Sequence, residues 1–162
     1  MLIIRAARWS DHAELKPIVD AFAEMHSRWD PGFRSRWLGF TAAIFQTWLQ
    51  ASDEFHLVAV RDGKVVGYTS GGKFLGNDGI HLFSRRNIFV YTLVVAETER
   101  GQGIGRKLFA AIEDQAREHD AEIIQLNVTT ANTDAKAFYE KLGYVSGSET
   151  RTKVVQHVKR YE

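Results

Sequence analysis

Cysteine is absent from this chain of 162 residues. Its absence excludes disulfide bonds, thiolate-ligated zinc, iron–sulfur clusters and a cysteine acyl-enzyme. The six histidines are scattered without the spacing of metal ligands, so we expect no metal cofactor. A chain without cysteine also fits a reducing compartment, and we expect the protein in the cytoplasm.

Long apolar runs and a surplus of charge of one sign are missing as well. At the amino terminus, the apolar run reaches Arg5 too soon for a signal peptide. The longest uncharged stretch, residues 37–52, is too short and too polar to span a bilayer. With 21 basic and 20 acidic residues, the chain has no global field that would attract nucleic acid or an anionic membrane. We therefore expect neither as a partner.

Repeats, low-complexity segments and linkers are not found in the sequence either. The length, with 44% hydrophobic residues, suits one compact domain around one hydrophobic core. We therefore predict a single domain over residues 1–162.

The sequence does contain a regular succession of apolar patterns. The dipeptide Asp62-Gly63 lies between two β-like runs and predicts a hairpin, because these residues tolerate the positive φ angles of a tight turn. A nearly continuous apolar run at residues 88–95 predicts a strand covered on both faces. The remaining patterns predict strands at residues 2–6, 122–128, 144–149 and 152–161, and helices at residues 11–26, 41–50, 103–119 and 133–142.

The resulting order of elements is βααβββαβαββ. A hairpin on one side and a strand–helix–strand crossover on the other predict a mixed sheet of about seven strands. Helices should cover both faces of this sheet, which places the chain in the α/β (α+β) class.

Residue types that can bind an anion gather where the third predicted helix begins. Glycines at alternate positions allow a tight turn and leave backbone N–H groups uncovered. The first turn of the helix adds the positive end of the helix dipole, and basic side chains add charge. The segment therefore predicts a cradle for a diphosphate. It consists of Arg100, Gly101, Gln102, Gly103, Ile104, Gly105, Arg106 and Lys107.

Two common diphosphate-binding motifs do not fit this glycine cluster. The Walker motif requires Gly-Lys followed by Ser or Thr, whereas Gly105 is followed by Arg-Lys-Leu. The dinucleotide fingerprint requires Gly-x-Gly-x-x-Gly, whereas this segment reads Gly-x-Gly-x-Gly and follows a hairpin. A glycine-rich turn with solvated basic residues is the alternative to a cradle.

The glycine cluster, with the preceding segment YTLVV at residues 91–95, resembles the acyl-CoA signature of the GNAT acetyltransferase superfamily. Residues 132–144 (NTDAKAFYEKLGY) resemble the second motif of that family, and the order of elements matches over nearly the whole chain. The resemblance implies a V-shaped gap between the parallel strands 88–95 and 122–128. It also implies that acetyl-CoA, the co-substrate, lies in this gap with its pyrophosphate on the glycine cluster.

The resemblance also implies roles for single residues. The backbone groups of Leu93 and Val95 match positions that bind the pantetheine arm and the thioester carbonyl, where negative charge develops during attack. Asn132 matches a position that contacts the cofactor, and it is equally suited to cap a helix. The implied cofactor-binding residues are Leu93, Val94, Val95, Arg100, Gly101, Gln102, Gly103, Ile104, Gly105, Arg106 and Asn132.

Tyr139 is the implied catalytic residue. Its place on an apolar stripe with i, i+3 and i+4 spacing would ordinarily indicate a core residue. By resemblance it is the general acid that protonates the departing CoA thiolate, a proton transfer that a phenol can make.

No general base is identified in the sequence. Many members of the family carry a carboxylate on the cofactor strand, about where Tyr91 and Thr92 stand here, and neither residue is acidic. Glu24, His26, His81 and an ordered water are the alternatives.

The acceptor side is expected in residues 28–37 and 79–86, where arginines alternate with aromatic residues. Such residues can hold an anionic or aromatic substrate, or they pack on the sheet with solvated arginines around them. The acceptor and the oligomeric state are not readable from the sequence. A homodimer paired through the final strand is compatible with the fold.

The predicted function is therefore transfer of an acetyl group from acetyl-CoA to a primary amine of a small molecule or peptide, by direct attack in a ternary complex. An acyl-CoA sensor without turnover is the first alternative, because the strand carboxylate is missing. A protein that binds anions or RNA through its arginine-rich segments is the second.

Overall fold

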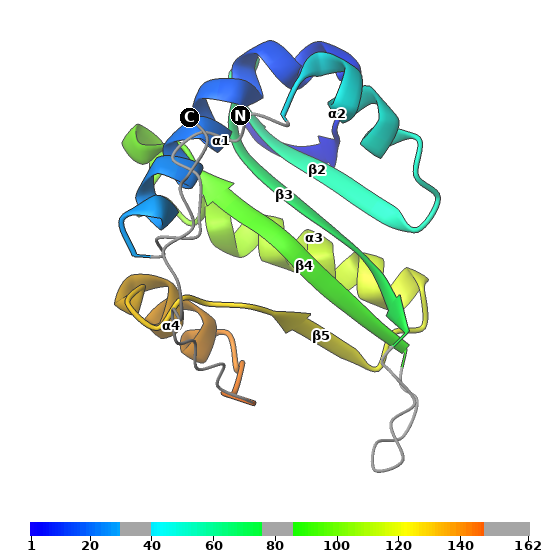
Figure 1. The fold of residues 1–162 in the computed structure, drawn as a ribbon, viewed down its shortest axis with the longest axis vertical. Helices are drawn as coiled ribbons and strands as arrows, with labels where there is room; N and C mark the ends of the chain where they lie inside the picture. The colour runs from blue at the N-terminus through cyan, green and yellow to red at the C-terminus, as the bar shows by residue number, and fades with distance from the viewer. Residues whose placement is uncertain (30–39, 76–85, 148–162) are drawn as a thin grey trace, which may run out of the picture. The chain divides into compact units, whose positions relative to one another are not determined.

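The computed structural model describes residues 1–29, 40–75 and 86–147 (Figure 1). Contacts within the chain define two compact units, Met1–Thr129 and Thr130–Glu162. The strands and the first three α-helices belong to the first unit, and the last helix belongs to the second.

A mixed sheet of five strands forms the centre of the first unit. Its strands are β1 (Leu2–Ala6), β2 (Glu54–Arg61), β3 (Lys64–Leu75), β4 (Arg86–Val95) and β5 (Ile123–Leu126). They lie side by side in this order; the first four pair antiparallel, and β4 pairs parallel with β5. This confirms the predicted fold class and the predicted order of the first nine helices and strands.

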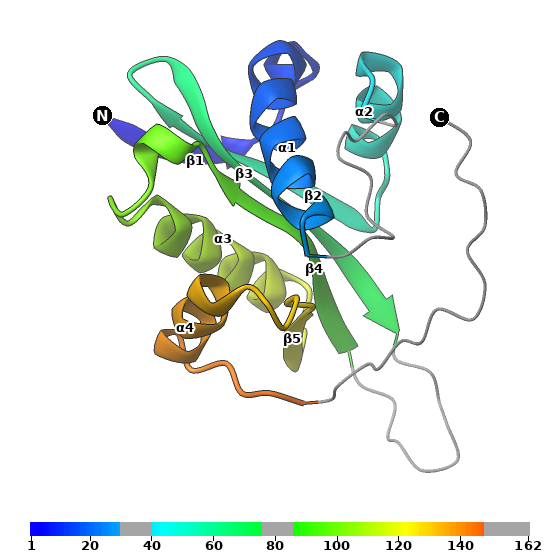
Figure 2. The ribbon, with the colours of Figure 1, turned by 60° about the vertical axis from the view of Figure 1, so that its left-hand side comes forward.

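The helices α1 (His12–Ser27) and α2 (Ala42–Leu49) cover one face of the sheet, and α3 (Ile104–Glu118) covers the other (Figure 2). The alternation of side chains along β2 produces this arrangement. Val58 and Val60 are buried in one cluster with α1 and α2, whereas Ala59 between them is buried in a cluster with α3. A chain segment with apolar residues on both faces therefore becomes a central strand.

Short sequence motifs determine where α2 begins and where β2 turns into β3. Thr41 caps α2, because its hydroxyl oxygen accepts a hydrogen bond from the Ile44 N–H at 3.2 Å. Asp62 and Gly63 turn the hairpin between β2 and β3 with φ angles of 49° and 82°. The turn is as predicted from the sequence, and the cap agrees with the helix predicted at residues 41–50.

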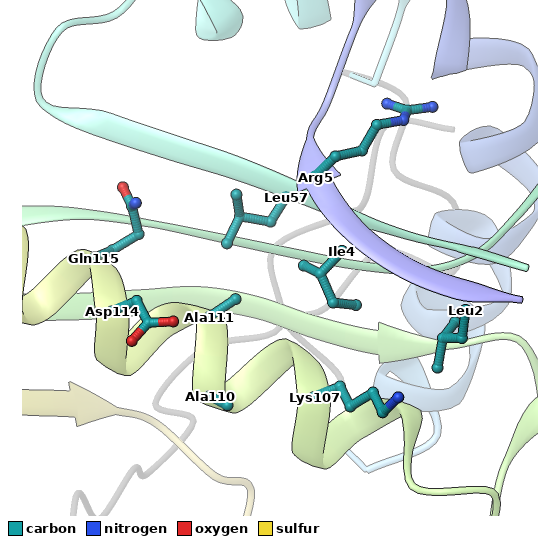
Figure 3. A pocket seen from close by; sticks show the side chains of 9 residues that line it. All are labelled: Leu2, Ile4, Arg5, Leu57, Lys107, Ala110, Ala111, Asp114 and Gln115. Carbon is teal, nitrogen blue, oxygen red and sulfur yellow. The ribbon is translucent and has the colours of Figure 1, made fainter.

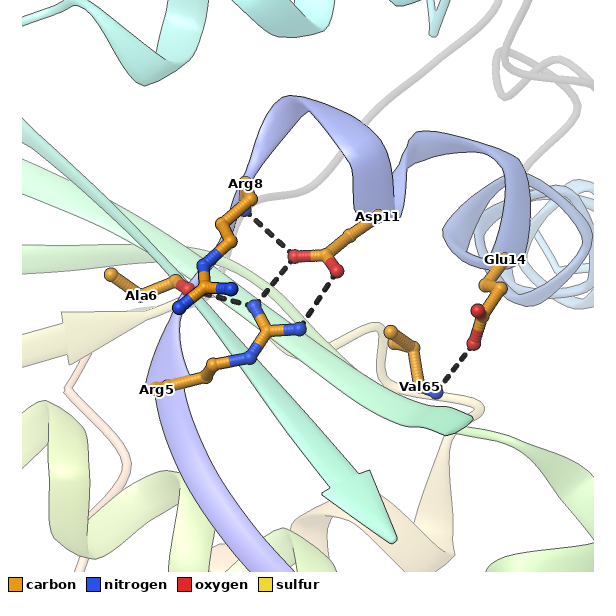
Figure 4. Close-up of polar contacts among 6 residues, drawn as sticks. All are labelled: Arg5, Ala6, Arg8, Asp11, Glu14 and Val65. Atoms are coloured by element: carbon orange, nitrogen blue, oxygen red, sulfur yellow. Dashed lines mark hydrogen bonds and ion pairs between the residues drawn. The ribbon is translucent and has the colours of Figure 1, made fainter. Parts of the chain in front are cut away.

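Asp11 connects β1 to the start of α1 (Figure 4). Its carboxylate accepts two hydrogen bonds from the Arg5 guanidinium, at 2.7 and 2.8 Å, and one from the Arg8 backbone N–H at 2.7 Å. The hydrogen bond from Arg5 lowers the pKa of Asp11, although burial acts in the opposite direction. One turn further along, Glu14 accepts a hydrogen bond from the Val65 N–H at 2.7 Å, which ties α1 to β3.

We expect Asp11→Ala to lower the free energy of unfolding by about 2 kcal/mol at pH 7, because a partly buried guanidinium and a backbone N–H lose their acceptor. The pKa of Asp11 is lower in the folded than in the unfolded chain. Its stabilisation is therefore complete above about pH 4 and is lost as the pH falls through the folded value. Urea unfolding at pH 7 and pH 3 measures this difference.

Asp114→Ala is the matched control, because Asp114 makes an exposed ion pair with Arg117. It should change the free energy of unfolding by less than about 0.5 kcal/mol. A cost of Asp11→Ala that does not shrink at pH 3 would contradict the role given to this carboxylate.

The second unit contains α4 (Thr133–Lys141). After it, Gly143 has a φ of 88°, and the Tyr144 N–H donates to the Tyr139 carbonyl at 3.0 Å, so a left-handed glycine ends the helix predicted at residues 133–142. This cap holds Tyr144 at the helix end, and residues 144–147 form no strand, which corrects the strand predicted from residue 144. The rest of that strand and the one predicted at residues 152–161 lie outside the described residues.

Candidate functional site

The strand β4 loses one of its two neighbours halfway along its length. It pairs with β3 from Arg86 to Val95, but with β5 only as far as Val90, which lies opposite Leu126. In the described chain, Tyr91–Val95 has no strand partner on the β5 side. Apart from the Val95 carbonyl, which accepts a hydrogen bond from Arg100, the backbone groups on that side can therefore pair with a ligand that lies along the strand. We call this part of β4 the open segment.

A β-bulge marks the start of the open segment. Ser70 of β3 lies opposite Thr92, and the next residue, Gly71, lies opposite Val90. Tyr91 is thus the extra residue of β4. A bulge bends its strand and increases the local twist, so β4 turns away from β5 at the point where their pairing ends.

The glycine cluster follows β4 and opens α3. Gly101 and Gly103 have φ angles of 76° and 78°, and a Cβ added to either would meet no atom within 4 Å. Gly103 is the N-cap of α3, which has no side-chain cap and no acidic residue in its first turn. The first N–H groups of α3 have no intrahelical acceptor, and Arg106 and Lys107 beside them are exposed. This helix end therefore has the properties of an anion-binding site.

Two polar side chains of the cluster are held by neighbouring elements. The Arg100 Nε–H donates to the Val95 carbonyl at 3.2 Å, which folds this side chain back onto the end of β4. Arg61 of β2 donates to the Gln102 side-chain oxygen and to the Glu99 carboxylate, the latter at 2.6 Å. The Gln102 side chain thus ties the loop to β2. Only the backbone of Gln102 is then left to contact a ligand.

From Thr92 to Val95, the side chains of the open segment face into the protein, whereas Tyr91 is exposed. Val94 is buried in the cluster with α1, and Leu93 and Val95 pack against the cluster with α3. Any contact of these residues with a ligand beside β4 must therefore come from the backbone. The structure brings the predicted site residues from Leu93 to Arg106 together along the end of β4 and the start of α3.

The other two predicted site residues, Asn132 and Tyr139, belong to the second unit. Asn132 Oδ1 accepts a hydrogen bond from the Ala135 N–H at 3.1 Å, which confirms its role as the cap of α4; its contact with a cofactor stays a prediction. The Tyr139 ring packs edge-on against Phe138 and Tyr144, with ring centroids 5.2 and 6.0 Å away. Burial raises the pKa of Tyr139 to about 12, so the phenol keeps its proton at neutral pH.

The sequence-based candidates for the base lie on α1 or outside the described residues. Glu24 is exposed and pairs with Arg28 at 2.9 Å. His26 Nδ1 lies 3.0 Å from the Phe22 carbonyl oxygen. His81 and most of the two segments predicted for the acceptor lie outside the described residues.

A polar network without an assigned role in the sequence analysis lies on β2 and β3. The His56 ring is 2.7 Å from the Tyr68 hydroxyl through Nδ1 and 3.2 Å from the Glu54 carboxylate through Nε2. Burial raises the pKa of Tyr68, and it lowers the pKa of His56 against the opposing effect of Glu54. The signal in the sequence was the i, i+2 spacing of Glu54 and His56, which puts both side chains on one face of a strand.

A hollow of about 470 Å³ lies between β1, β2 and α3 (Figure 3). Leu2, Ile4 and Leu57 from the strands face Ala110 and Ala111 of the helix, so its walls are mainly aliphatic. Lys107 of the predicted cradle lines it, but none of the implied cofactor-binding residues does. The described helices include none that is long and apolar enough to cross a membrane. Residues 1–29, 40–75 and 86–147 bring no three potential metal-ligating side chains together.

Comparison with known proteins gives similar relatives and similar structures. Residues 21–144 match the family model described as Acetyltransferase (GNAT) family. The chain is 28% identical over 89 residues to the L-amino acid N-acyltransferase MnaT of Escherichia coli (strain K12), a match that covers 55% of this chain and 49% of MnaT. It is 25% identical over 142 residues to the uncharacterized N-acetyltransferase YhfO of Bacillus subtilis (strain 168), a match that covers 87% of this chain and 88% of YhfO.

Among solved structures, a mutant of the BH1408 protein from Bacillus halodurans has a TM-score of 0.87 to this chain at 29% sequence identity, covering 95% of this chain and 99% of that one. The chain thus spans about half the length of MnaT and nearly the whole length of YhfO and of the BH1408 structure.

Proposed function

The chain belongs to the GNAT acetyltransferase family, and we propose that it transfers the acetyl group of acetyl-CoA to a primary amine of a small molecule or peptide. The matched residues 21–144 include the open segment of β4, the glycine cluster and α4. Two features carry the proposal: an edge of β4 that has no strand partner in the described part of the chain and, after residues 96–103, a helix N-terminus without a side-chain cap.

The chemistry of acetyl-CoA suits both features. Its pyrophosphate can accept hydrogen bonds from the N–H groups at the start of α3, with Arg106 adding positive charge. The open segment from Tyr91 to Val95 is about 13 Å long, at about 3.3 Å per residue. The amide groups of an extended pantetheine arm can pair along it as an added strand does. The acetyl group then lies at the Tyr91 end of the open segment.

In the proposed reaction, the amine nitrogen forms a bond to the thioester carbonyl carbon, and backbone N–H groups of the open segment stabilise the charge that develops on the carbonyl oxygen. The C–S bond then breaks, and its electron pair leaves on the sulfur. Tyr139 is proposed to donate to that sulfur. Because a thiol has a pKa of about 8.5, transfer of the proton from a phenol with a pKa of about 12 is uphill. The hydrogen bond to the developing thiolate therefore carries most of the effect.

The test is release of CoA thiol from acetyl-CoA in the presence of a panel of L-amino acids and a short peptide with a free amino terminus. MnaT is an L-amino acid N-acyltransferase by name, which motivates the first group of acceptors. We expect at least one acceptor to raise the rate at least tenfold above that with acetyl-CoA alone.

A sensor of acetyl-CoA is the second candidate function, favoured by the absence of a carboxylate at Tyr91 and Thr92 of β4. Calorimetric binding of acetyl-CoA without acceptor-dependent release of CoA would support the sensor. Absence of binding would contradict both functions.

A further inference from the structure

We infer that Glu54 is the general base of the proposed reaction and that it binds the acceptor as an ammonium ion before taking its proton. The inference rests on the proposed acetyl transfer. It assigns the base to β2, two strands away from the strand that the cofactor is proposed to line. The geometry at the β4 bulge carries it.

Glu54 and Tyr91 approach each other over Gly72. Gly72 of β3 lies directly opposite Glu54 in the pairing of β2 with β3. A Cβ added to Gly72 would lie 2.8 Å from the Tyr91 hydroxyl oxygen and 3.4 Å from Glu54 Cγ. The missing side chain thus lets the Tyr91 hydroxyl and the Asp53 carbonyl oxygen, at 2.9 Å from that Cβ position, lie close over Gly72 beside the Glu54 side chain. We call the site formed by Glu54, Gly72 and Tyr91 the niche. Because Tyr91 begins the open segment, this niche adjoins the proposed position of the acetyl group.

The niche has one side in solvent and one side in the core. The Glu54 side chain is 32% exposed, and Tyr91 is 49% exposed. Behind them, His56 is 7% exposed and contacts Glu54 Oε2 through Nε2. An amine can therefore reach Glu54 from outside while one carboxylate oxygen is held from inside.

The His56 ring is fixed by its neighbours. Trp48 and Tyr68 stack on it with interplanar angles of 6° and 17° and centroids 6.3 and 6.1 Å away. In the His56 tautomer that carries its proton on Nε2, Nδ1 accepts a hydrogen bond from the Tyr68 hydroxyl, 2.7 Å away. The Nε2–H of a neutral His56 then donates to Glu54. His56 is thus a positioning residue, which orients the carboxylate without neutralising its charge.

The groups that face Glu54 in the described chain come from three strands. They are His56 on β2, Tyr68 on β3 and Tyr91 on β4, and α2 carries no charged residue. After burial, the charge of Glu54 is the next electrostatic cause that raises the pKa of Tyr91. The negative charge of Glu54 beside hydroxyl groups attracts a cation, which is the form of a primary amine at neutral pH.

In the proposed step, the acceptor nitrogen loses two protons and gains the acetyl group. One proton of the acceptor ammonium passes to a Glu54 carboxylate oxygen, and the neutral nitrogen forms the bond to the thioester carbon. The C–S bond breaks with its electron pair on the sulfur. The second proton lost by the nitrogen ends on that sulfur as CoA thiol, and Glu54 returns its proton to water.

Glu54→Gln tests the inference, because it keeps the size of the side chain and removes the proton acceptor. With acetyl-CoA and the L-amino acid panel, we expect kcat to fall about 10²–10⁴-fold at pH 7, while the Kd for acetyl-CoA changes less than twofold. The loss should shrink as the pH rises, because the solution then supplies the neutral amine. Asp53→Asn is the matched control. It removes the same charge from the adjacent, exposed residue and should leave kcat within twofold.

Glu54→Asp keeps the carboxylate but withdraws it by one methylene group. We expect kcat to fall about tenfold and its pH profile to stay that of the wild type. A folded Glu54→Gln protein whose kcat falls less than fivefold, or falls by the same factor at every pH, would overturn the inference and leave the proposed function intact. If Glu54→Gln does not fold, a wild-type kcat in Glu54→Asp would overturn it instead. No acetyl-CoA binding and no turnover by the wild-type protein would overturn the proposed function and the inference together.

Discussion

Tyr139→Phe is expected to lower kcat about 10²–10⁴-fold and to leave the affinity for acetyl-CoA within about twofold. The substitution keeps the ring and its edge-on packing against Phe138 and Tyr144, and it removes only the hydroxyl. An interaction made chiefly in the transition state is lost from kcat rather than from binding. A hydroxyl with a structural role only would give a stability loss of about 0.5–1.5 kcal/mol and nearly intact turnover.

Tyr144→Phe is the control, because it removes a hydroxyl from the ring next to Tyr139, with centroids 6.0 Å apart. It should retain kcat within about twofold. Steady-state kinetics on an acceptor from the panel, with a melting curve for each protein, separate the two effects. A loss of less than fivefold in Tyr139→Phe, where chemistry limits turnover, would remove Tyr139 as the donor to the sulfur.

The elements that the sequence predicted well are those fixed by neighbouring residues. Asp62-Gly63 forms the hairpin turn with φ angles of 49° and 82°. Thr41 caps α2, the helix that begins at the next residue. Each depends on the conformational freedom or hydrogen bonding of residues a few positions apart. The start of α3 at the glycine cluster was predictable for the same reason, because the glycines and the helix that they open are contiguous.

The bulge at Tyr91 could not be predicted in this way, because it depends on the register of β3 against β4. A partial signal was present in Gly71-Gly72, since glycine within a strand is typical of a bulge or of a close backbone approach. A Cβ on Gly71 would lie 2.5 Å from Phe55 Cζ and 2.6 Å from the Phe89 carbonyl oxygen. The sequence shows that a glycine stands there, but only the paired strands show which groups exclude a side chain.

The niche at Glu54 was missed for a related reason. Its three components, Glu54, Gly72 and Tyr91, come from three strands and meet only through two antiparallel pairings. A search for a carboxylate on the cofactor strand alone finds none. Once the strands are paired, the Glu54 side chain of β2 and the Tyr91 hydroxyl of β4 both lie beside Gly72.

Gly103→Val is expected to weaken acetyl-CoA binding at least tenfold, a loss of about 1.4 kcal/mol or more. The new side chain would stand in the open space before the N–H groups of α3, and a φ of 78° also strains a β-branched residue. Gly63→Val separates these effects, because Gly63 has a φ of 82° and equally open space but lies in the hairpin turn. Both variants should lose similar stability, about 1–2 kcal/mol, and only Gly103→Val should lose affinity in calorimetry with acetyl-CoA. An equal loss of affinity in both would assign the effect to strain. An unchanged Kd in folded Gly103→Val would place the pyrophosphate away from the glycine cluster, because a β-branched side chain cannot stand before those N–H groups without obstructing an anion bound to them.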